Sequence, residues 1–307
     1  MSEPACLEAE VTPPWTYRLP RRGSGNGTTR VRDGVVCRLL CIGDAPVVAH
    51  AWQIRSGEVR FRVTGDAPTD ALEAGLERMR FTLGVDDDLS DFFAEFKRDE
   101  VLGPALRRRP WARPRRRPSP WEALAGAIAG QLIEASRAAA IERRMVRRWG
   151  RCVAAPSPLP GGSLRDAPGP EAIAGRAPAE LAGMDLSGGR SIAMIRCARE
   201  VAAGRIDLTR PGHDEHLEHI REIGPWTVQC LGFHGRGEAD SLPAGDLAYV
   251  KLVGRLAGLR RRATVPEVEE YFEPYRPFRG LAGIFAAMHY HSGVRAGPPL
   301  RLEQRYG

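Results

Sequence analysis

The chain has 307 residues, 43% of them hydrophobic and 27% charged, which is the composition of an ordinary soluble protein with ample core. Its formal net charge of +7 at pH 7 and its isoelectric point near 9.4 favour a polyanionic partner. We expect neither a membrane span nor a secretory signal: no apolar run approaches the roughly 20 residues of a span, and the N-terminus lacks the signal-peptide pattern.

The six cysteines are scattered without the spacing of metal ligands. Such a pattern is typical of free thiols in a reducing compartment, so we expect a cytoplasmic protein. These residues are Cys6, Cys37, Cys41, Cys152, Cys197 and Cys230.

The first part of the chain predicts a small α+β domain. From about residue 15 to 65, apolar and polar residues alternate, and Gly-Asp and Ser-Gly pairs separate the runs, which predicts a small antiparallel sheet. A helix is expected over residues 69–85, capped by Thr69 or Asp70, and a shorter one over residues 89–99.

An arginine- and proline-rich stretch, LRRRPWARPRRRPSP, separates this part from the rest. Because its prolines interrupt both helices and strands, we interpret it as the connection between two domains. A solvated linker is the simpler interpretation, and a segment that contacts DNA directly is the alternative. The predicted order is an α+β domain, the connection and an all-helical domain, at residues 1–105, 106–120 and 121–307.

The second part of the chain is predicted to be almost entirely helical, without a repeat of fixed period. One long helix is expected to begin with Ser119 as N-cap and Pro120 in its first turn, and to end at Gly150. Further helices are expected near residues 170–182, 188–204, 213–222, 225–234, 246–258, 265–274 and 278–291.

The segment IREIGPWTVQC predicts two helices joined by a tight hairpin. Pro225 fits the first position of the second helix, whose N–H has no helical partner, and Gly224 can take the positive φ of a tight reversal. An ordinary connection between core helices is one interpretation. The other is a hairpin whose backbone amides hold a phosphate at a helix N-terminus.

Asp246 follows a Pro-Ala-Gly turn and precedes an apolar helix. An aspartate there is a good helix N-cap. The alternative role is a carboxylate that faces a cleft, where it could stabilise a developing cation or activate water. Trp226 and Phe278 are expected in the core, unless they line the same cleft and offer a stacking surface to a flat, electron-poor ring.

Gln131 and Leu132 interrupt a run of small residues, AGAIAGQLIEAS. They fit a transition from surface to core, or a wedge that enters a duplex where a base has been extruded.

Three histidines, His213, His216 and His219, recur at three-residue spacing in the segment HDEHLEH. A zinc site is conceivable because this spacing places imidazoles on one side of a helix. The spacing fits no common zinc motif, so partly exposed helix histidines are favoured over the site of a metal hydrolase.

Taken in order, four segments resemble the helix-hairpin-helix glycosylase superfamily, and within it most of all the bacterial DNA-3-methyladenine glycosylase II family. The segments are WEALAGAIAGQLIEASRAA, LEHIREIGPWTVQCLGF, LPAGDLAYVKL and YRPFRGLAGIFAAMHY. The N-terminal α+β part is also similar to the first domain of that family. A hairpin followed at the family's spacing by PAGD is a specific combination.

The resemblance implies a monofunctional glycosylase of base excision repair. Such an enzyme flips an alkylated purine, 3-methyladenine or 7-methylguanine, out of double-stranded DNA and hydrolyses its N-glycosidic bond. The resemblance implies that Asp246 is the catalytic aspartate, that Gln131 and Leu132 form the wedge, and that Trp226 and Phe278 line the base pocket.

The resemblance also assigns the hairpin and the cofactors. It implies that Glu222, Ile223, Gly224 and Trp226 grip a DNA phosphate, and that a structural monovalent cation binds the backbone carbonyls of Glu218, Ile220 and Ile223. Trp226 stands where the lyase branch has its Schiff-base lysine, which argues against lyase activity. The lack of clustered C-terminal cysteines argues against an iron–sulfur cluster. No cofactor is required, and we expect a monomer.

Four positions depart from the family pattern. Glu222 stands where glycine is usual, so a carboxylate and a side chain at positive φ both weigh against DNA affinity. Cys230 and Leu247 replace tyrosines of the base pocket, and Glu134 replaces a small hydroxyl residue after the wedge. The alternatives are a glycosylase for uracil or an oxidised purine, and a non-catalytic protein that binds duplex DNA.

Overall fold

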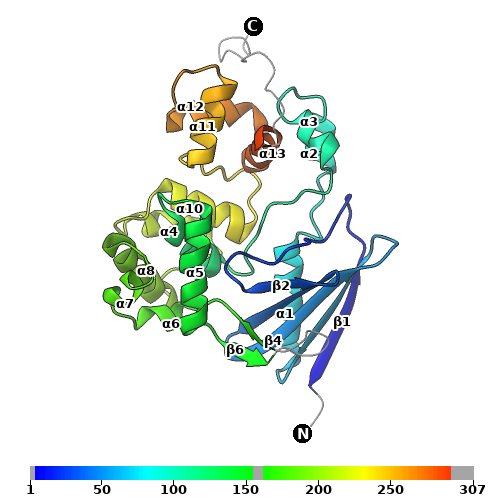
Figure 1. Cartoon of the computed structure of the whole chain (residues 1–307), viewed down its shortest axis with the longest axis vertical. Coiled ribbons are helices and arrows are strands. Elements are labelled where there is room, and N and C mark those ends of the chain that lie inside the picture. Colours follow the sequence, from blue (N-terminus) through cyan, green and yellow to red (C-terminus); the bar gives the residue numbers. More distant parts are fainter. Residues whose placement is uncertain (1–3, 155–161, 292–307) are drawn as a thin grey trace.

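The computed structural model describes residues 4–154 and 162–291 (Figure 1). Residues 292–307 of the predicted helical domain lie outside this part of the chain. The described residues form one antiparallel sheet of five strands, a small two-stranded hairpin and two groups of helices. Within the described ranges, every helix is too short or too polar to cross a membrane.

The five-stranded sheet has the order β1-β5-β4-β3-β2, with every neighbouring pair antiparallel. The predicted alternation over residues 15–65 is confirmed by four of its strands. The first strand lies outside that region and pairs along its whole length with the last one. The strands are β1 (Ala5–Val11), β2 (Thr29–Arg32), β3 (Val35–Ile42), β4 (Ala45–Gln53) and β5 (Val59–Gly65).

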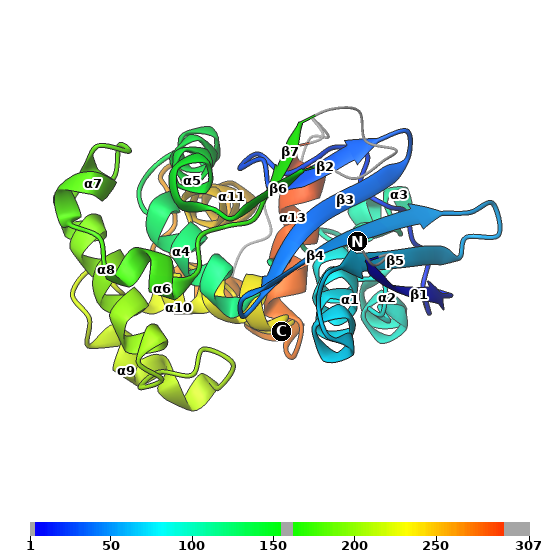
Figure 2. The ribbon, with the colours of Figure 1, turned by 90° about the horizontal axis from the view of Figure 1, so that it is seen from below.

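Helix α1 (Thr69–Leu83) covers one face of this sheet (Figure 2). Its buried Leu72 and Met79 pack in one core cluster with apolar strand residues. The prediction that Thr69 or Asp70 caps this helix is wrong, because the N-cap is Pro68, which offers no side-chain hydrogen bond. Proline sets the extended backbone before the first turn, and Thr69 is already helical.

The first group of helices runs from α4 to α10 and has its own core. The single helix expected from Ser119 to Gly150 is two helices, because α4 ends at Gly130 and α5 begins at Ala135. The N-cap is confirmed, since the Ser119 hydroxyl accepts the Glu122 N–H at 3.2 Å. The helix expected over 170–182 is also two helices.

The helices of this group are α4 (Pro120–Gly130), α5 (Ala135–Trp149), α6 (Pro170–Ala174), α7 (Pro178–Ala182), α8 (Gly188–Ala202), α9 (Asp214–Glu218) and α10 (Pro225–Leu231), which continues as a π-helical segment, Gly232–Arg236. A hairpin of β6 (Cys152–Ala154) and β7 (Ser163–Arg165) joins the group to the sheet. Leu164 of β7 packs against buried residues of β3 and β4.

The second group combines helices that precede the first group in the sequence with helices that follow it. It consists of α2 (Ser90–Phe96), α3 (Gly103–Arg108), α11 (Leu247–Leu256), α12 (Val265–Phe272) and α13 (Arg279–His291). The rings of Phe92 and Phe93 lie 5.5 Å and 5.9 Å from that of Phe285 on α13. Residues 89–105, which belong to the predicted N-terminal domain, therefore contribute to the core of the C-terminal helices.

Ion pairs and hydrogen bonds hold arginine side chains of the connection against the rest of the protein. The Arg116 guanidinium lies 2.6 Å from Asp87, and Arg113 donates to the carbonyl of Thr16 at 3.2 Å. Arg117 lies 2.8 Å from Glu142 on α5. The interpretation of this stretch as a solvated linker is therefore wrong for these three arginines, because intramolecular acceptors hold their side chains.

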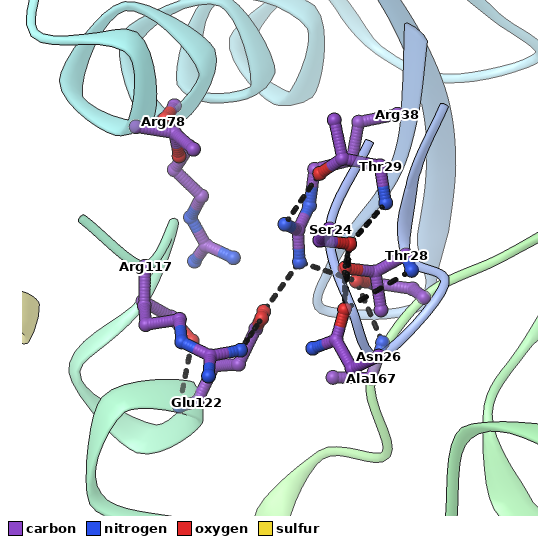
Figure 3. Close-up of polar contacts among 12 residues, drawn as sticks. Ser24, Asn26, Thr28, Thr29, Arg38, Arg78, Arg117, Glu122 and Ala167 are labelled. Atoms are coloured by element: carbon purple, nitrogen blue, oxygen red, sulfur yellow. Dashed lines mark hydrogen bonds and ion pairs between the residues drawn. The ribbon is translucent and has the colours of Figure 1, made fainter. Parts of the chain in front are cut away.

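A buried network of charges joins the sheet to the first helical group (Figure 3). Arg38 of β3 lies 2.5 Å from Glu122 of α4, and Arg117 approaches the same carboxylate to 3.2 Å. Burial alone would raise the pKa of Glu122, but the two guanidinium groups bring it below its ordinary value. Burial raises the pKa of the neighbouring Asp166 in spite of Arg38. Paired charges that connect β3 with α4 favour one relative position of the two parts.

Candidate active site

The hairpin between α9 and α10 is anchored by two buried side chains, those of Ile220 and Ile223. Glu222 between them adopts a φ of 76°, the left-handed conformation that favours glycine. Gly224 has a φ of −126°, so the expectation that it takes the positive φ is wrong. The reversal occurs two residues earlier, and Gly224 instead leaves open space beside the backbone that leads into Pro225.

The turn between α4 and α5 separates the two residues of the predicted wedge. Leu132 is fully exposed at a φ of 57°, so a transition from surface to core is wrong for this side chain. The Gln131 side chain points to the hairpin, where its Nε2 donates to the Glu222 carbonyl at 2.7 Å and to the Thr227 hydroxyl at 3.0 Å. Only Leu132 therefore has the geometry of an inserting side chain.

Asp246 is the N-cap of α11, as one of its two interpretations requires. Its Oδ1 accepts the Ala248 N–H at 2.7 Å, and its own N–H donates to the Pro243 carbonyl at 2.8 Å. These bonds fix the carboxylate at the end of the LPAGD turn. The cap does not exclude a chemical role, because a carboxylate has further acceptor sites and this one also faces a cavity.

This cavity lies between the two helical groups and has a volume of about 380 Å³. It is near the lower end of the usual range for ligand pockets, about 300–1,000 Å³, which suits a single flat ring system. Its wall comes from the end of α10, from the start of α11, from α13 and from the residue after α3. The lining residues are Arg109, Cys230, Phe233, His234, Pro243, Asp246, Ala248, Tyr249, Ile284, Ala287 and Met288.

Three titratable side chains that share this wall with Asp246, those of Cys230, Tyr249 and His234, are uncharged at neutral pH, whereas Arg109 carries a positive charge. Burial, and then the charge of Asp246, raise the pKa of the Cys230 thiol and of the Tyr249 hydroxyl. Burial lowers the pKa of His234, whose Nδ1 lies 2.7 Å from the Arg115 carbonyl. Among the described residues of the wall, Asp246 is therefore the one anion, and an aromatic face and a sulfur atom lie near it.

The structure brings Asp246 and Cys230 together but leaves three predicted pocket residues out of the wall. Leu247 points outward and is 44% exposed. Phe278 lies before the first turn of α13, with its ring 5.5 Å from that of Phe92, so the α2 phenylalanines hold it in the core. Trp226 packs against the LPAGD turn, where a Cβ placed on Gly245 would lie 3.7 Å from the Cβ of Trp226, and it is not among the lining residues.

Several residues of the wall carry no sequence motif. His234 belongs to the π-helical continuation of α10, and Met288 lies two turns into α13. Tyr249 is the exception, since it follows Asp246 by three residues and therefore points from the same side of a helix. Gly283 on α13 permits its packing, because a Cβ there would lie 2.9 Å from the Tyr249 ring.

The histidines of the HDEHLEH segment are not brought together as ligands. His213 accepts the Asp207 N–H at 2.8 Å through Nδ1, while His219 lies 2.7 Å from the Glu215 carbonyl through the same atom. Within residues 4–154 and 162–291, no group of three or more His, Cys, Asp or Glu side chains is placed to hold a metal ion. The geometry gives no support to a metal hydrolase.

Known proteins resemble this chain in sequence and in fold. No protein-family model matches the sequence. A DNA-3-methyladenine glycosylase of Bacillus subtilis (strain 168) is 22% identical over 269 residues, which cover 83% of this chain and 86% of that protein. A 3-methyladenine DNA-glycosylase from Archaeoglobus fulgidus superposes with a TM-score of 0.78 at 20% identity, covering 93% of this chain and 99% of the other.

A second solved structure, the 8-oxoguanine glycosylase/lyase of Clostridium acetobutylicum, superposes with a TM-score of 0.68 at 13% identity, covering 94% of this chain and 99% of the other. Its complex with double-stranded DNA gives 0.63 at 12% identity, over 86% and 97% of the two chains. The fold of this chain is that of the helix-hairpin-helix DNA glycosylase superfamily.

Proposed function

We propose that this protein is a monofunctional DNA glycosylase that hydrolyses the N-glycosidic bond of alkylated purines in double-stranded DNA. The observation that carries the proposal is Asp246, the one carboxylate in the described wall of a cavity of base size. The names of the Bacillus and Archaeoglobus proteins, both 3-methyladenine glycosylases, support the alkylated base. The complex of the Clostridium protein with DNA supports a duplex substrate.

The chemistry follows from the charge of the damaged base. Alkylation of a ring nitrogen makes the purine cationic and a better leaving group, so little acid assistance is needed. A carboxylate beside the sugar then stabilises the oxocarbenium-like transition state or directs the attacking water. The ring of Tyr249 offers an apolar face to the cationic base, while Cys230 and Tyr249, both protonated, add no competing charge.

Among the described residues that line the cavity, none carries the amine that a lyase step would need. The chain has two lysines, Lys97 and Lys251, and neither lines the wall. Lys251 is exposed on α11 and Lys97 follows α2. Without a Schiff base, the product is an intact abasic site.

The hairpin is the element that we assign to the DNA backbone. Pro225 has no N–H and the Thr227 amide donates to the Gly224 carbonyl at 2.9 Å, so we assign the phosphate to the Trp226 amide and to the space that Gly224 leaves open beside it. The carbonyls of Glu218, Ile220 and Ile223 are hard oxygen donors of the kind that monovalent cations bind. The Ile220 carbonyl already accepts the Ile223 N–H at 2.9 Å and keeps a second lone pair for such an ion.

The direct test of the function is base release from randomly methylated duplex DNA, with the freed bases identified chromatographically. We expect release of 3-methyladenine and 7-methylguanine, strand breaks only after alkali, and no covalent trapping by borohydride. Duplexes that contain uracil or 8-oxoguanine serve as the comparison. Release of 8-oxoguanine or uracil alone would contradict the alkylated substrate, and trapping would contradict the monofunctional mechanism.

Truncation of the wedge gives a second prediction. Leu132→Ala should slow release from duplex DNA about tenfold or more, because the gap left by the extruded base is no longer filled. Since Leu132 is fully exposed, the free energy of unfolding should change by less than about 0.5 kcal/mol. Ile192→Ala, at an exposed position on α8, is the matched control and should affect neither quantity. A large fall in the melting temperature of Leu132→Ala would contradict the wedge.

A further inference from the structure

The turn that carries Leu132 has little of its own to hold it in place. Leu132 is fully exposed and adopts a φ of 57°, which is unfavourable for a branched apolar residue. A side chain inserts into a duplex most effectively when it already points in the required direction. A freely moving side chain has to be ordered at the moment of insertion, and this ordering costs free energy. The restraint must therefore come from the residues on either side of Leu132.

One restraint reaches the turn from α8. Helix α4 ends at Gly130, and its last carbonyls have no partner within the helix. The guanidinium of Arg190 provides the hydrogen-bond donor at this end of the helix. Its Nη1 donates to the Ala129 carbonyl at 3.0 Å and to the Gln131 carbonyl at 3.1 Å. Its Nε donates to the Ser187 hydroxyl at 3.0 Å, which fixes the arginine to the start of its own helix.

The second restraint links the same turn to the hairpin. Gln131 Nε2 donates to the carbonyl of Glu222, the residue at positive φ, and to the hydroxyl of Thr227 in α10. Thr227 is almost completely buried, so its hydroxyl is a fixed anchor. The two strained turns, one at Leu132 and one at Glu222, are therefore joined by a single side chain across 91 residues of sequence.

We propose that Gln131 and Arg190 are positioning residues that clamp the Leu132 turn to the hairpin, so that capture of the DNA backbone and insertion of Leu132 occur as one movement. Gln131 is thereby not itself an inserting residue. This inference rests on the proposed function for its biological setting, because extrusion of a base is what the clamp serves. Its physical content, a rigid coupling between hairpin and wedge, is measured without catalysis.

The experiment uses Gln131→Met and Arg190→Met, which keep side-chain length and remove the donors. Arg196→Met, at an exposed position on α8, is the matched control. A duplex carries 2-aminopurine next to a stable abasic-site analogue, so that its fluorescence rises when a side chain enters and unstacks the step. A second duplex has the same reporter in a bulge that is already unstacked. Stopped-flow fluorescence gives the insertion rate, and anisotropy gives the affinity.

We expect each clamp variant to slow insertion into the paired duplex about tenfold, the effect of one or two lost hydrogen bonds. On the bulged duplex their affinity should fall less than twofold. In a Leu132→Ala background the same substitutions should add almost nothing, because the side chain they position is gone. The Arg196→Met protein should match the wild type throughout.

Equal losses on paired and bulged duplexes, or full additivity with Leu132→Ala, would show that these residues only support the fold. A wild-type protein that binds the duplex without changing the fluorescence would also overturn the clamp. The proposed function is decided separately by base release. A protein that inserts Leu132 in this assay and releases no base from any duplex would retain the clamp and lose the assigned activity.

Discussion

Asp246→Asn should abolish base release while leaving the fold and the affinity for duplex DNA unchanged. The variant keeps the shape of the side chain and the acceptor for the Ala248 N–H, and asparagine is as good an N-cap as aspartate. It removes the only negative charge that the described wall of the cavity offers to an oxocarbenium-like sugar. Loss of one such electrostatic contact costs on the order of 10²–10³ in rate, and more where no other group replaces it.

The measurement is single-turnover release of 7-methylguanine at saturating enzyme, with fluorescence anisotropy for DNA affinity and thermal unfolding for stability. Asp70→Asn is the matched control, because Asp70 lies in the first turn of α1 and its Oδ1 also bonds a backbone N–H of that turn. It should release base at the wild-type rate. Wild-type turnover by Asp246→Asn would show that the charge is not used and that Asp246 is a cap alone.

Glu122→Gln should produce the largest loss of stability of any conservative substitution that we consider. Glu122 is 4% exposed, and its carboxylate lies against Arg38 and Arg117. Removal of the charge weakens the pairing of two buried guanidinium groups, although Arg38 keeps Asp166 at 3.7 Å and Arg117 keeps Glu142 at 2.8 Å. We expect a cost on the order of 3 kcal/mol in the free energy of unfolding. Urea unfolding followed by circular dichroism measures this change.

Two further variants make the measurement specific. Glu73→Gln, at an exposed position on α1, should change the free energy of unfolding by less than about 0.5 kcal/mol. Arg38→Met combined with Glu122→Gln should cost less than the sum of the two single changes, because both members of the pair are removed. Additive losses would mean that the two charges do not interact in the folded protein.

Acid should reduce the difference between wild type and Glu122→Gln. The folded state lowers the pKa of Glu122, so the stability it contributes is present above the ordinary carboxyl pKa, about 4.3, and is lost as the pH falls below that value. The two proteins should therefore approach one another in stability as the pH falls below about 4.3.

The sequence predicts well those features that depend on neighbours along the chain. The N-caps at Ser119 and Asp246 and the strands over residues 15–65 follow from local preferences, and all are present. The hairpin is also local, although its positive φ belongs to Glu222 and not to Gly224. A glycine that permits a conformation does not show that the conformation is used.

Features that depend on distant packing escape prediction. Phe278 would be free to line the cavity were it not for Phe92 and Phe96, which come from a part of the chain assigned to another domain. His234 and Met288 line the cavity at the place where the π-helical segment lies beside α13. Neither contact leaves a periodicity or a fixed spacing in the sequence. The family resemblance therefore assigns the pocket to Trp226 and Phe278 and not to the residues that form the wall.

The residues that line the cavity are synthesised at very different times, because they lie far apart in the sequence. Its wall begins with Arg109 and is completed by Met288, so the ribosome has to reach Met288 before this space can close. The hairpin and the Leu132 turn precede α13 and share a core that does not include it. A nascent chain stalled before α13 would therefore display the hairpin and the Leu132 turn without the closed cavity beside Asp246, so on the proposed function it would have the elements assigned to DNA and lack the pocket assigned to the base.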